Sequence, residues 1–365
     1  MAFGIELNPI RLCDIKINPV QKEIVNSLLD QGLIGQSYII EQFEKSMAKW
    51  LGVNYCVAVS SGTMADTIAL AALKYKYPKK NEVIVPALTF IAQINSVYYN
   101  HLKPIFVDVD YRLNMDVSEV EKEINDNTLC LFPVNLLGKP ADYDSLSRLN
   151  VPIVEDSCES LGSEYNLLGL GFKKCGTIGE MGTFSFFPTH TLATGEGGMI
   201  ATNDEFYYET AKILRNHGRR TDEFKHEVIG FNGKMSSLEA ALGFGAIDTL
   251  DGVVETRRRN YKLFGGEEKE NEKICPHGFP FLASDAEERE GMREMLKKEG
   301  VETRSLFSSI PTQEKAYSFM KRRRRHFNRA EAVGQTGYYI PCHQGMIEYD
   351  VLTVKKLIHN YYKGV

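Results

Sequence analysis

Residues 182–200 of the chain read GTFSFFPTHTLATGEGGMI. The stretch opens and closes with apolar runs typical of β-strands, and a short loop headed by His190 lies between them. Gly197 and Gly198 are adjacent, and paired glycines occur where backbone takes a positive φ or lies close to another group. The stretch therefore predicts two strands around a loop. That loop either approaches a ligand or forms a tight turn with an exposed histidine.

The composition of the 365-residue chain is ordinary for a soluble globular protein, with 43% hydrophobic and 25% charged residues. This length allows one large domain or two moderate ones. The net charge of −5 argues against nucleic-acid binding. No apolar run reaches membrane-spanning length, and the first residues lack the pattern of a secretion signal. We therefore expect a cytoplasmic protein without membrane contact.

The seven cysteines are scattered, and none forms a C-x-x-C pair. This spacing argues against a zinc or iron–sulfur site, so we expect no metal. It is typical of buried thiols in a reducing compartment.

Short apolar segments alternate with helical segments between residues 55 and 156, which predicts an α/β fold with a mainly parallel sheet and helices on both faces. The predicted strands are Tyr55–Val59, Glu82–Pro86, Pro104–Val109, Leu129–Val134 and Pro152–Glu155. In such sheets, ligands bind beyond the carboxyl ends of the strands. The polar or aromatic residues that follow these strands are therefore candidate site residues: Ser61, Gly62, Thr63, Thr89, Phe90, Asn135 and Asp156.

The loop at residues 60–63 stands between a predicted strand and a predicted helix that begins at Met64. Free N–H groups and the helix dipole at such a position can bind a phosphate. The alternative is an ordinary N-cap made by Ser61 or Thr63.

The pattern of predicted strands and helices in the sequence changes near residue 250. We predict a large domain with an N-terminal arm over residues 1–249 and a smaller α/β domain over residues 250–365. A helix that begins near Ser236 is expected to break near Gly252 and to continue as a charged helix to Phe264.

Five motifs together resemble the DegT/DnrJ/EryC1/StrS family of sugar aminotransferases, which use pyridoxal 5'-phosphate (PLP). They are SSGTMA at 60–65, PALTF at 86–90, VEDSCESLG at 154–162, the opening stretch at 182–200 and GFNGKM at 230–235. The resemblance covers nearly the whole chain. It implies the aspartate-aminotransferase-like fold type I, with a large cofactor-binding domain and a smaller C-terminal domain.

The resemblance also implies a role for individual residues. Asp156 is expected to pair with the pyridine nitrogen and keep it protonated, so that the ring withdraws electrons. Phe90 is expected to stack on the cofactor, and Glu159 to share a proton near its phenolic oxygen. The cofactor phosphate is assigned to Gly62, Thr63, Met64 and Ser185 and, from the neighbouring subunit, Asn232. The last contact implies a homodimer with shared active sites.

His190 occupies the position at which the family carries the lysine that holds PLP covalently. An imidazole cannot form that stable bond, but with an ordinary pKa near ~6.5 it can act as a general base. The exchange is similar to that in the branch of sugar 3-dehydratases, which act on substrates such as GDP-4-keto-6-deoxy-D-mannose. That branch uses pyridoxamine 5'-phosphate (PMP) without a covalent tether, and L-glutamate regenerates it. The resemblance thus implies C3 deoxygenation of a nucleotide-linked 4-keto-6-deoxysugar in deoxysugar or lipopolysaccharide biosynthesis, with His190 as the base.

Two alternatives remain open. One is a PLP-dependent nucleotide-keto-sugar aminotransferase whose lysine is replaced by His190. The other is a non-catalytic protein that binds PLP or a nucleotide sugar.

Several polar residues have two interpretations at this stage. Asn135 stands where many family members carry a histidine near the substrate. His217, Arg219 and Arg220 are either substrate contacts or surface charges. The basic run at 321–325 is either a phosphate-binding patch or a solvated helix face.

Overall fold

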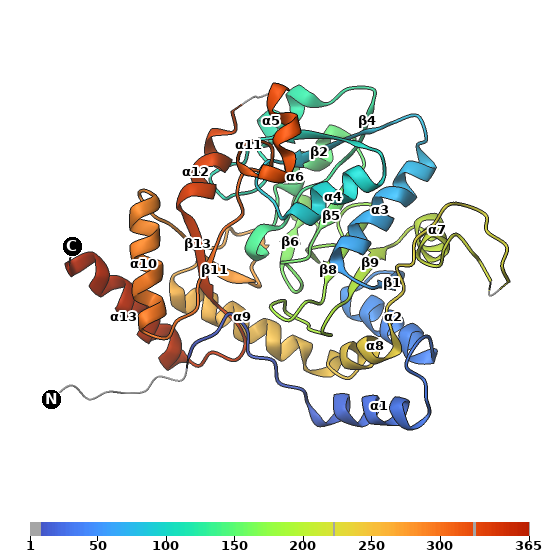
Figure 1. Cartoon of the computed structure of the whole chain (residues 1–365), viewed down its shortest axis with the longest axis horizontal. Helices are drawn as coiled ribbons and strands as arrows, with labels where there is room; N and C mark the ends of the chain where they lie inside the picture. Colours follow the sequence, from blue (N-terminus) through green and yellow to red (C-terminus); the bar gives the residue numbers. More distant parts are fainter. Residues whose placement is uncertain (1–8, 222, 324–325, 365) are drawn as a thin grey trace.

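The computed structural model describes residues 9–221, 223–323 and 326–364 (Figure 1). Its central sheet contains the strands β1 Tyr55–Val59, β2 Glu82–Pro86, β3 Lys103–Val107, β4 Thr128–Leu131, β5 Val154–Asp156, β8 Met181–Ser185 and β9 Gly198–Thr202. The two parts of the sheet have the orders β3-β2-β4 and β5-β8-β9-β1, and isolated parallel bridges connect β4 to β5. The pairs of these strands are parallel, except that β9 runs antiparallel to both β1 and β8. The predicted mainly parallel sheet is confirmed.

Helices cover both faces of this sheet, since alternate side chains of a strand point to opposite sides. Along β1, Val57 and Val59 belong to one hydrophobic cluster, whereas Cys56 and Ala58 belong to another. The helices of this part are α1 Pro19–Asp30, α2 Tyr38–Leu51, α3 Gly62–Lys76, α4 Ile91–Tyr99, α5 Val117–Glu123, α6 Tyr143–Leu146, α7 Glu205–Arg215, α8 Ser237–Phe244 and α9 Leu250–Phe264. None of the described helices combines the length and the apolar character that crossing a membrane requires.

The helix break predicted near Gly252 lies elsewhere. Helix α9 is continuous from Leu250 to Phe264, and the interruption follows Phe244, where Gly245 caps α8. A Cβ at Gly245 would lie 2.9 Å from the Cα of Gln21, whereas one at Gly252 would meet nothing within 4 Å. The break therefore falls where α1 packs against the chain, and Gly252 lies on an open side of the helix.

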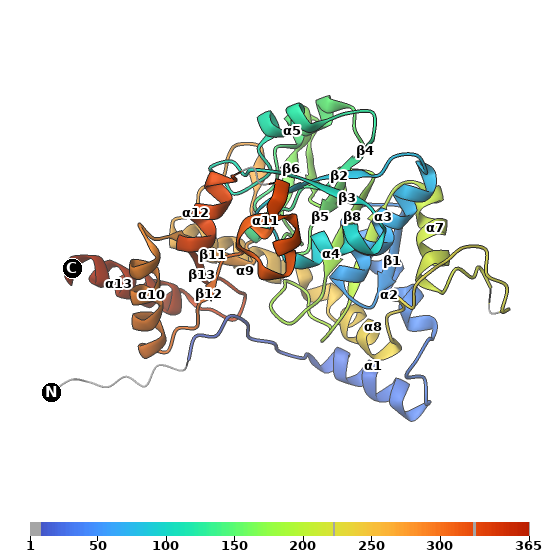
Figure 2. The same ribbon diagram turned by 45° about the horizontal axis from the view of Figure 1, so that its top comes forward.

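The C-terminal part has an antiparallel sheet of its own, ordered β11-β13-β12. Its elements are β11 Gly278–Leu282, α10 Ala286–Lys298, β12 Arg304–Ser305, α11 Ile310–Gln313, α12 Asn328–Thr336, β13 Gly337–Pro341 and α13 Glu348–Gly364. Figure 1 shows α9 running from the large sheet to this part, and Figure 2 shows α11 over the large sheet. The basic run at 321–325 lies outside the residues whose side chains the structure describes.

The predicted boundary at residue 250 stays a prediction, and two segments pack across it. Ile10, from the N-terminal arm, packs in the cluster of the C-terminal part. Leu306, Ile310 and Ala330 pack in the core of the large sheet.

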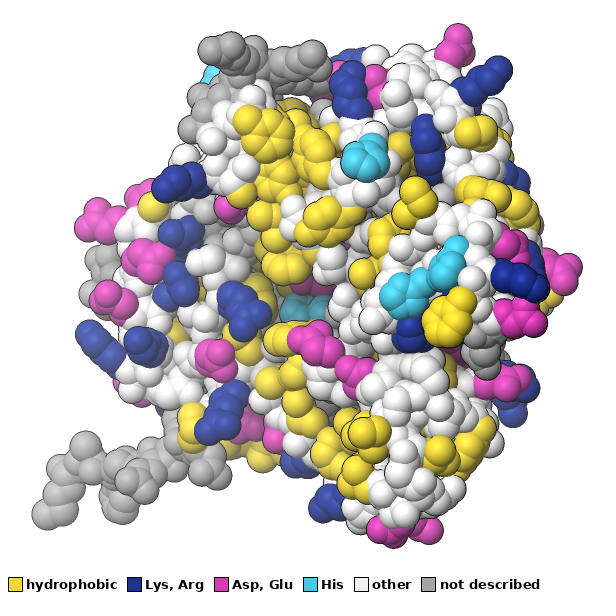
Figure 3. Space-filling model, turned by 45° about the vertical axis from the view of Figure 1, so that its right-hand side comes forward, with side chains coloured by type: hydrophobic (Ala, Val, Ile, Leu, Met, Phe, Trp, Pro, Cys, Tyr) yellow, Lys and Arg dark blue, Asp and Glu magenta, His cyan; other side chains and the backbone are white. Residues whose placement is uncertain are grey.

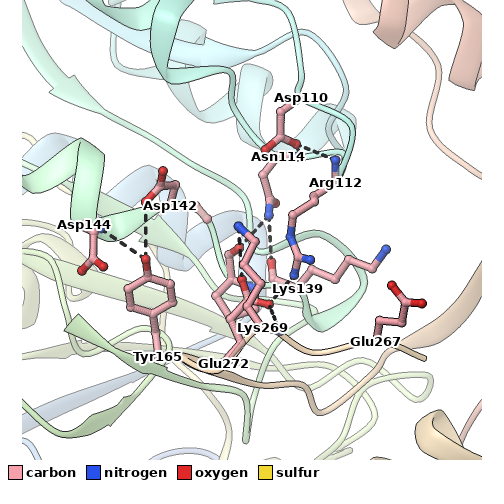
Figure 4. Close-up of polar contacts among 12 residues, drawn as sticks. Asp110, Arg112, Asn114, Lys139, Asp142, Asp144, Tyr165, Glu267, Lys269 and Glu272 are labelled. Atoms are coloured by element: carbon pink, nitrogen blue, oxygen red, sulfur yellow. Dashed lines mark hydrogen bonds and ion pairs between the residues drawn. The ribbon is translucent and has the colours of Figure 1, made fainter. Parts of the chain in front are cut away.

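Three very short strands, β6 Glu164–Asn166, β7 Phe172–Lys174 and β10 Glu272–Lys273, form a further small sheet. Polar contacts bind it to the large domain, as Figure 4 shows. Arg112 forms an ion pair with the almost fully buried Glu272 of β10, and the Tyr165 hydroxyl of β6 donates a hydrogen bond to Asp142 over 3.4 Å. Strands of two or three residues carry too little sequence pattern to be predicted.

Candidate active site

A cavity of about 370 Å³ lies beyond the carboxyl ends of β5 and β8. Eight of the predicted site residues line it: Ser61, Gly62, Thr63, Phe90, Asp156, Glu159, Ser185 and His190. Figure 3 shows a hollow near the middle of one face, with histidine and acidic side chains among hydrophobic ones. A larger groove of about 690 Å³ runs along α9, but charged surface residues dominate its lining and it contains none of the predicted site residues.

One end of the cavity is formed by the first turn of α3. Ser61 caps this helix, because its hydroxyl accepts the Met64 N–H over 3.1 Å, and the same turn lines the cavity. The N-cap interpretation is therefore correct, and it leaves the helix N-terminus facing the cavity. A Cβ at Gly62 would lie 2.7 Å from the Cβ of Ser185, so these two predicted phosphate contacts are adjacent. Uncapped N–H groups and the helix dipole favour an anion there.

Gly198 explains part of the glycine-rich loop. A Cβ at this position would lie 2.3 Å from the Ser61 carbonyl oxygen. The glycine thus allows the start of β9 to lie directly beneath the start of α3. Met64 does not belong to the cavity lining, and its side chain lies close to Gly233.

One wall of the cavity carries buried carboxyl groups. Asp156 is 5% exposed and accepts the Cys158 N–H over 3.2 Å, and burial raises its pKa to about 6. Asp66, from α3, accepts the Thr183 hydroxyl over 2.6 Å. Burial and then the charge of Asp156 raise the pKa of Asp66 well above its ordinary value. A protonated ring nitrogen beside Asp156 would supply the positive charge that these carboxyls lack, so the site fits the pyridine end of PLP.

Asp66, Asp156 and Cys158 also offer ligand atoms within 4.8 Å of one another. Their pKa values are all raised, chiefly by burial, which favours protonated groups. A metal ion binds deprotonated ligands, so this trio suits a protonated heterocycle better.

Glu159 lies beside this wall and accepts the Leu137 N–H over 2.8 Å. Burial raises its pKa to about 7, against the opposing effect of that hydrogen bond. Near neutral pH its carboxyl group can therefore carry the proton that it would share with a phenolic oxygen. His277 places its Nε2 3.9 Å from the Glu159 carboxylate.

His190 lies in the loop between β8 and β9 and lines the cavity. Its side chain is half-buried, with Nδ1 enclosed and without a hydrogen-bond partner among the described residues. Burial, followed by the nearby Arg257 charge, lowers its pKa to about 3. The imidazole is thus neutral at pH 7 and can accept a proton. None of the described residues that line the cavity is a lysine.

Phe90 is 54% exposed at the cavity mouth, with its ring centroid 5.5 Å from that of Phe307. Asn232 lies outside the cavity on the surface, where its amide oxygen accepts a hydrogen bond from Lys234 over 2.8 Å. A role for Asn232 in a neighbouring subunit stays a prediction. Asn135 is fully buried and hydrogen-bonds to Ser157 and Tyr143, so its side chain holds the interior together.

His217, Arg219 and Arg220 also lie away from the cavity lining. Arg220 is exposed and forms ion pairs with Glu227 and Glu209. Arg219 donates a hydrogen bond to the Asn216 side chain over 3.2 Å. In the single chain, Arg220 fits the interpretation as a surface charge.

Sequence reasoning missed several residues that line the cavity: Asp66, Gln93, Glu196, His277, Arg304 and Tyr339. Asp66 could have been found, because it lies one helical turn after Gly62 and so faces the same side. His277, Arg304 and Tyr339 come from the C-terminal part and lie outside the five motifs that were recognised in the sequence.

The profile of the DegT/DnrJ/EryC1/StrS aminotransferase family matches residues 16–359. The chain is 32% identical to the GDP-perosamine synthase of Escherichia coli O157:H7 over 359 residues, which are 94% of this chain and 95% of that protein. It is 33% identical to the GDP-4-keto-6-deoxy-D-mannose 3-dehydratase of Yersinia pseudotuberculosis over 273 residues, 67% and 68% of the two chains. A solved GDP-4-keto-6-deoxymannose-3-dehydratase, with a trapped PLP-glutamate geminal diamine, superposes with a TM-score of 0.85 at 26% identity. That match covers 95% of this chain and 99% of the other.

Proposed function

Since the chain belongs to the DegT/DnrJ/EryC1/StrS aminotransferase family, we propose that it is a PMP-dependent 3-dehydratase of a nucleotide-linked 4-keto-6-deoxysugar. It is an enzyme of fold type I with PLP as its cofactor, of the sugar aminotransferase and dehydratase type. The family alone leaves both activities open, because its relatives include a GDP-perosamine synthase and a 3-dehydratase. One observation favours the dehydratase: His190 stands in the cavity where the family motif has lysine, and the described lining holds no lysine.

When bound, the cofactor supplies an amine that condenses with a ketone and a ring that withdraws electrons. Asp156 would hold the proton on the ring nitrogen, and the first turn of α3 with Ser185 would bind the phosphate, because all of these residues line the cavity. His190 accepts a proton through its neutral imidazole and then returns it to the departing C3 hydroxyl group.

The balance of the reaction defines its co-substrate. Replacing the C3 hydroxyl by hydrogen breaks one C–O bond, releases water and requires two electrons. L-Glutamate supplies these electrons as it becomes 2-oxoglutarate and ammonia. A relative's structure with a PLP-glutamate geminal diamine supports this choice of donor. The named relatives act on GDP-linked sugars, so GDP is the nucleotide to test first.

The test incubates the purified enzyme with PLP, L-glutamate and GDP-4-keto-6-deoxy-D-mannose. We expect free ammonia and a sugar nucleotide that has lost one oxygen atom, identified by mass spectrometry. The His190→Asn variant keeps a polar side chain but has no base, so it should release no ammonia. An amino sugar as product would instead show the aminotransferase, and absence of any conversion of a panel of 4-keto sugars would favour the binding protein.

The aminotransferase remains the second candidate function. It is favoured by the GDP-perosamine synthase that matches 94% of this chain. The same incubation separates the two, because transamination keeps the C3 oxygen and adds nitrogen to the sugar.

A further inference from the structure

Arg257, in α9, is the bulkiest of the fully buried side chains, with 1% of its surface exposed. In the described part of the chain, no carboxylate forms an ion pair with its guanidinium. A buried charge without an opposite charge is costly unless all of its donors are used. We therefore look for a role that depends on the shape or on the positive charge of this guanidinium.

The guanidinium donates almost entirely to backbone carbonyls. Its Nη2 donates to the carbonyl of His190 over 3.2 Å, and more weakly to that of Thr189 over 3.5 Å. Its Nη1 donates to the carbonyl of Pro276 over 2.9 Å and weakly to that of His277 over 3.5 Å. Its Nε donates to the Gln344 side chain over 2.8 Å. One side chain thus joins the loop after β8, the segment before β11 and the turn after β13.

The two segments joined in this way each bring an imidazole to the cavity. The ring centroids of His190 and His277 are 4.9 Å apart. His277 is 6% exposed, and its Nε2 faces Glu159 at 3.9 Å. The Nδ1 atoms of both rings are enclosed and have no hydrogen-bond partner among the described side and main chains. Since no hydrogen bond at Nδ1 orients either ring, the position of each ring depends largely on the backbone of its own residue.

We propose that Arg257 is the positioning residue of this site: it fixes the His190 loop to the His277 segment and so sets the orientation of the His190 ring as a base. This inference rests on the proposed function for the meaning of that orientation. Arg257 does not line the cavity, so it acts through His190 and touches neither substrate nor cofactor. It also makes the geometry of the base depend on residues of the C-terminal part.

The field of Arg257 supports the same role. Burial lowers the pKa of His190 most, and the positive charge of Arg257 is the second cause. The same charge contributes to the lowered pKa of His277. Other titratable or charged groups face the same cavity from the surrounding elements: Asp66, Asp156, Cys158, Glu159, Glu196, His277, Arg304 and Tyr339. The acidic groups among them oppose Arg257 when ionised, so the effect of Arg257 must be measured by difference.

The test compares Arg257→Gln and Arg257→Lys with the parent enzyme. Gln removes the charge and most of the donors, whereas Lys keeps the charge and loses the fork of the guanidinium. The readout is the pH titration of the His190 ring, followed by NMR in histidine-labelled protein and assigned with His190→Asn. We expect Arg257→Gln to raise the His190 pKa by about one unit or more, and Arg257→Lys to keep it low.

Ammonia release supplies the second readout. Loss of orientation should lower kcat by about 10- to 100-fold in both variants, with a small change in KM. In Arg257→Gln the acid limb of the pH profile should also move to higher pH. Arg259→Gln is the matched control in the same helix, because Arg259 donates to Asn260 and Met346 and contacts neither histidine.

A folded Arg257→Gln enzyme with an unchanged His190 titration and kcat would overturn the proposal. If that variant does not fold, Gln344→Leu replaces it, because it removes the Nε acceptor and leaves the charge. It should lower kcat and leave the His190 titration low, and an unchanged kcat would overturn the proposal equally. The titration requires no substrate. If Arg257→Gln shifts the His190 pKa but the parent enzyme converts no sugar, the proposed function is refuted and the positioning role stands. If the parent enzyme converts the sugar and the Arg257 variants convert it equally well, the positioning role is refuted and the proposed function stands.

Discussion

At the scale of single residues, Glu159 carries a pKa that is raised to about 7, chiefly by burial. Between its ordinary value of 4.5 and about 7, the folded protein binds a proton that the unfolded chain has released. The free energy of unfolding must therefore fall as the pH rises through this window. With 11% of its side chain exposed, Glu159 should contribute a loss of about 2–3 kcal/mol.

Glu159→Gln removes this titration. We expect the cofactor-free parent protein to lose about 2–3 kcal/mol more of its unfolding free energy than the variant between pH 5 and pH 8. Denaturant unfolding at both pH values measures the difference. The neighbouring carboxyls of Asp66 and Asp156 titrate in both proteins and cancel. Equal pH dependence in the two proteins would mean that Glu159 ionises normally.

His190 allows a second prediction at this scale. Because none of the described lining residues is a lysine, borohydride should not fix the cofactor to the parent protein. His190→Lys restores the amine of the family motif, so the same treatment should leave the cofactor attached after denaturation. Absorbance and peptide mass spectrometry read the result. Attachment in the parent protein, through any lysine, would contradict the non-covalent use of the cofactor.

The cavity-lining residues that the sequence identified lie at or shortly after the carboxyl ends of strands of the large sheet. Asp156 and Ser185 stand at strand ends, where topology alone predicts a ligand site. His277 directly precedes β11 and Arg304 lies in β12 of the C-terminal sheet, so their position at the cavity depends on how the two parts pack. No local pattern encodes that packing, so no local reading could name them.

At the scale of elements, the start of β9 and the start of α3 share their space at Gly198. Gly198→Ala would place a Cβ 2.3 Å from the Ser61 carbonyl oxygen, which is backbone and cannot rotate away. The first turn of α3 must then shift, and with it the predicted phosphate contacts of Gly62 and Thr63. We expect PLP affinity to fall by about tenfold or more, which is about 1.4 kcal/mol. Fluorescence titration with PLP measures it.

Gly252→Ala is the control for this substitution. It lies in the first turn of α9, and the added Cβ would meet nothing within 4 Å. An alanine in a helix is favoured over glycine by about 0.4–1 kcal/mol, so the thermal midpoint should hold or rise and PLP binding should stay unchanged. Equal affinities of the two variants would remove the role assigned to the β9–α3 contact.

Elements with a strong pattern were predicted closely. The bounds of β1 and β2 agree with the structure residue for residue, because buried apolar strands are encoded locally. The kink near Gly252 was wrong, since a glycine marks a break only where packing or φ requires one. The small sheet of β6, β7 and β10 was missed because pairing between distant short segments makes it.

At the scale of the whole molecule, the predicted domain boundary at residue 250 stays a prediction, and contacts cross it. Leu306 and Ile310 pack in the core of the large sheet, and Arg257 joins both parts beside the cavity. Two domains were predicted from a change in the sequence pattern. Such a pattern does not show which side chains of one predicted domain pack against the other.

Asn232 extends the same question to a second copy of the chain. It lies on the surface outside the cavity of its own chain, and a phosphate contact in a neighbouring subunit would explain its resemblance to the family motif.

Asn232→Asp would place a carboxylate against that phosphate, and His190→Asn removes the base, so each variant alone should be inactive. If the sites are shared, a heterodimer of the two variants has one intact site and one doubly altered site. An equimolar mixture, after dissociation and reassembly, should then regain about a quarter of the parental ammonia release. Mixing His190→Asn with Asp156→Ala should regain nothing, because both residues line the cavity of one chain and every site keeps one defect. If the first mixture also stays inactive, Asn232 serves its own chain, and the model of shared sites fails.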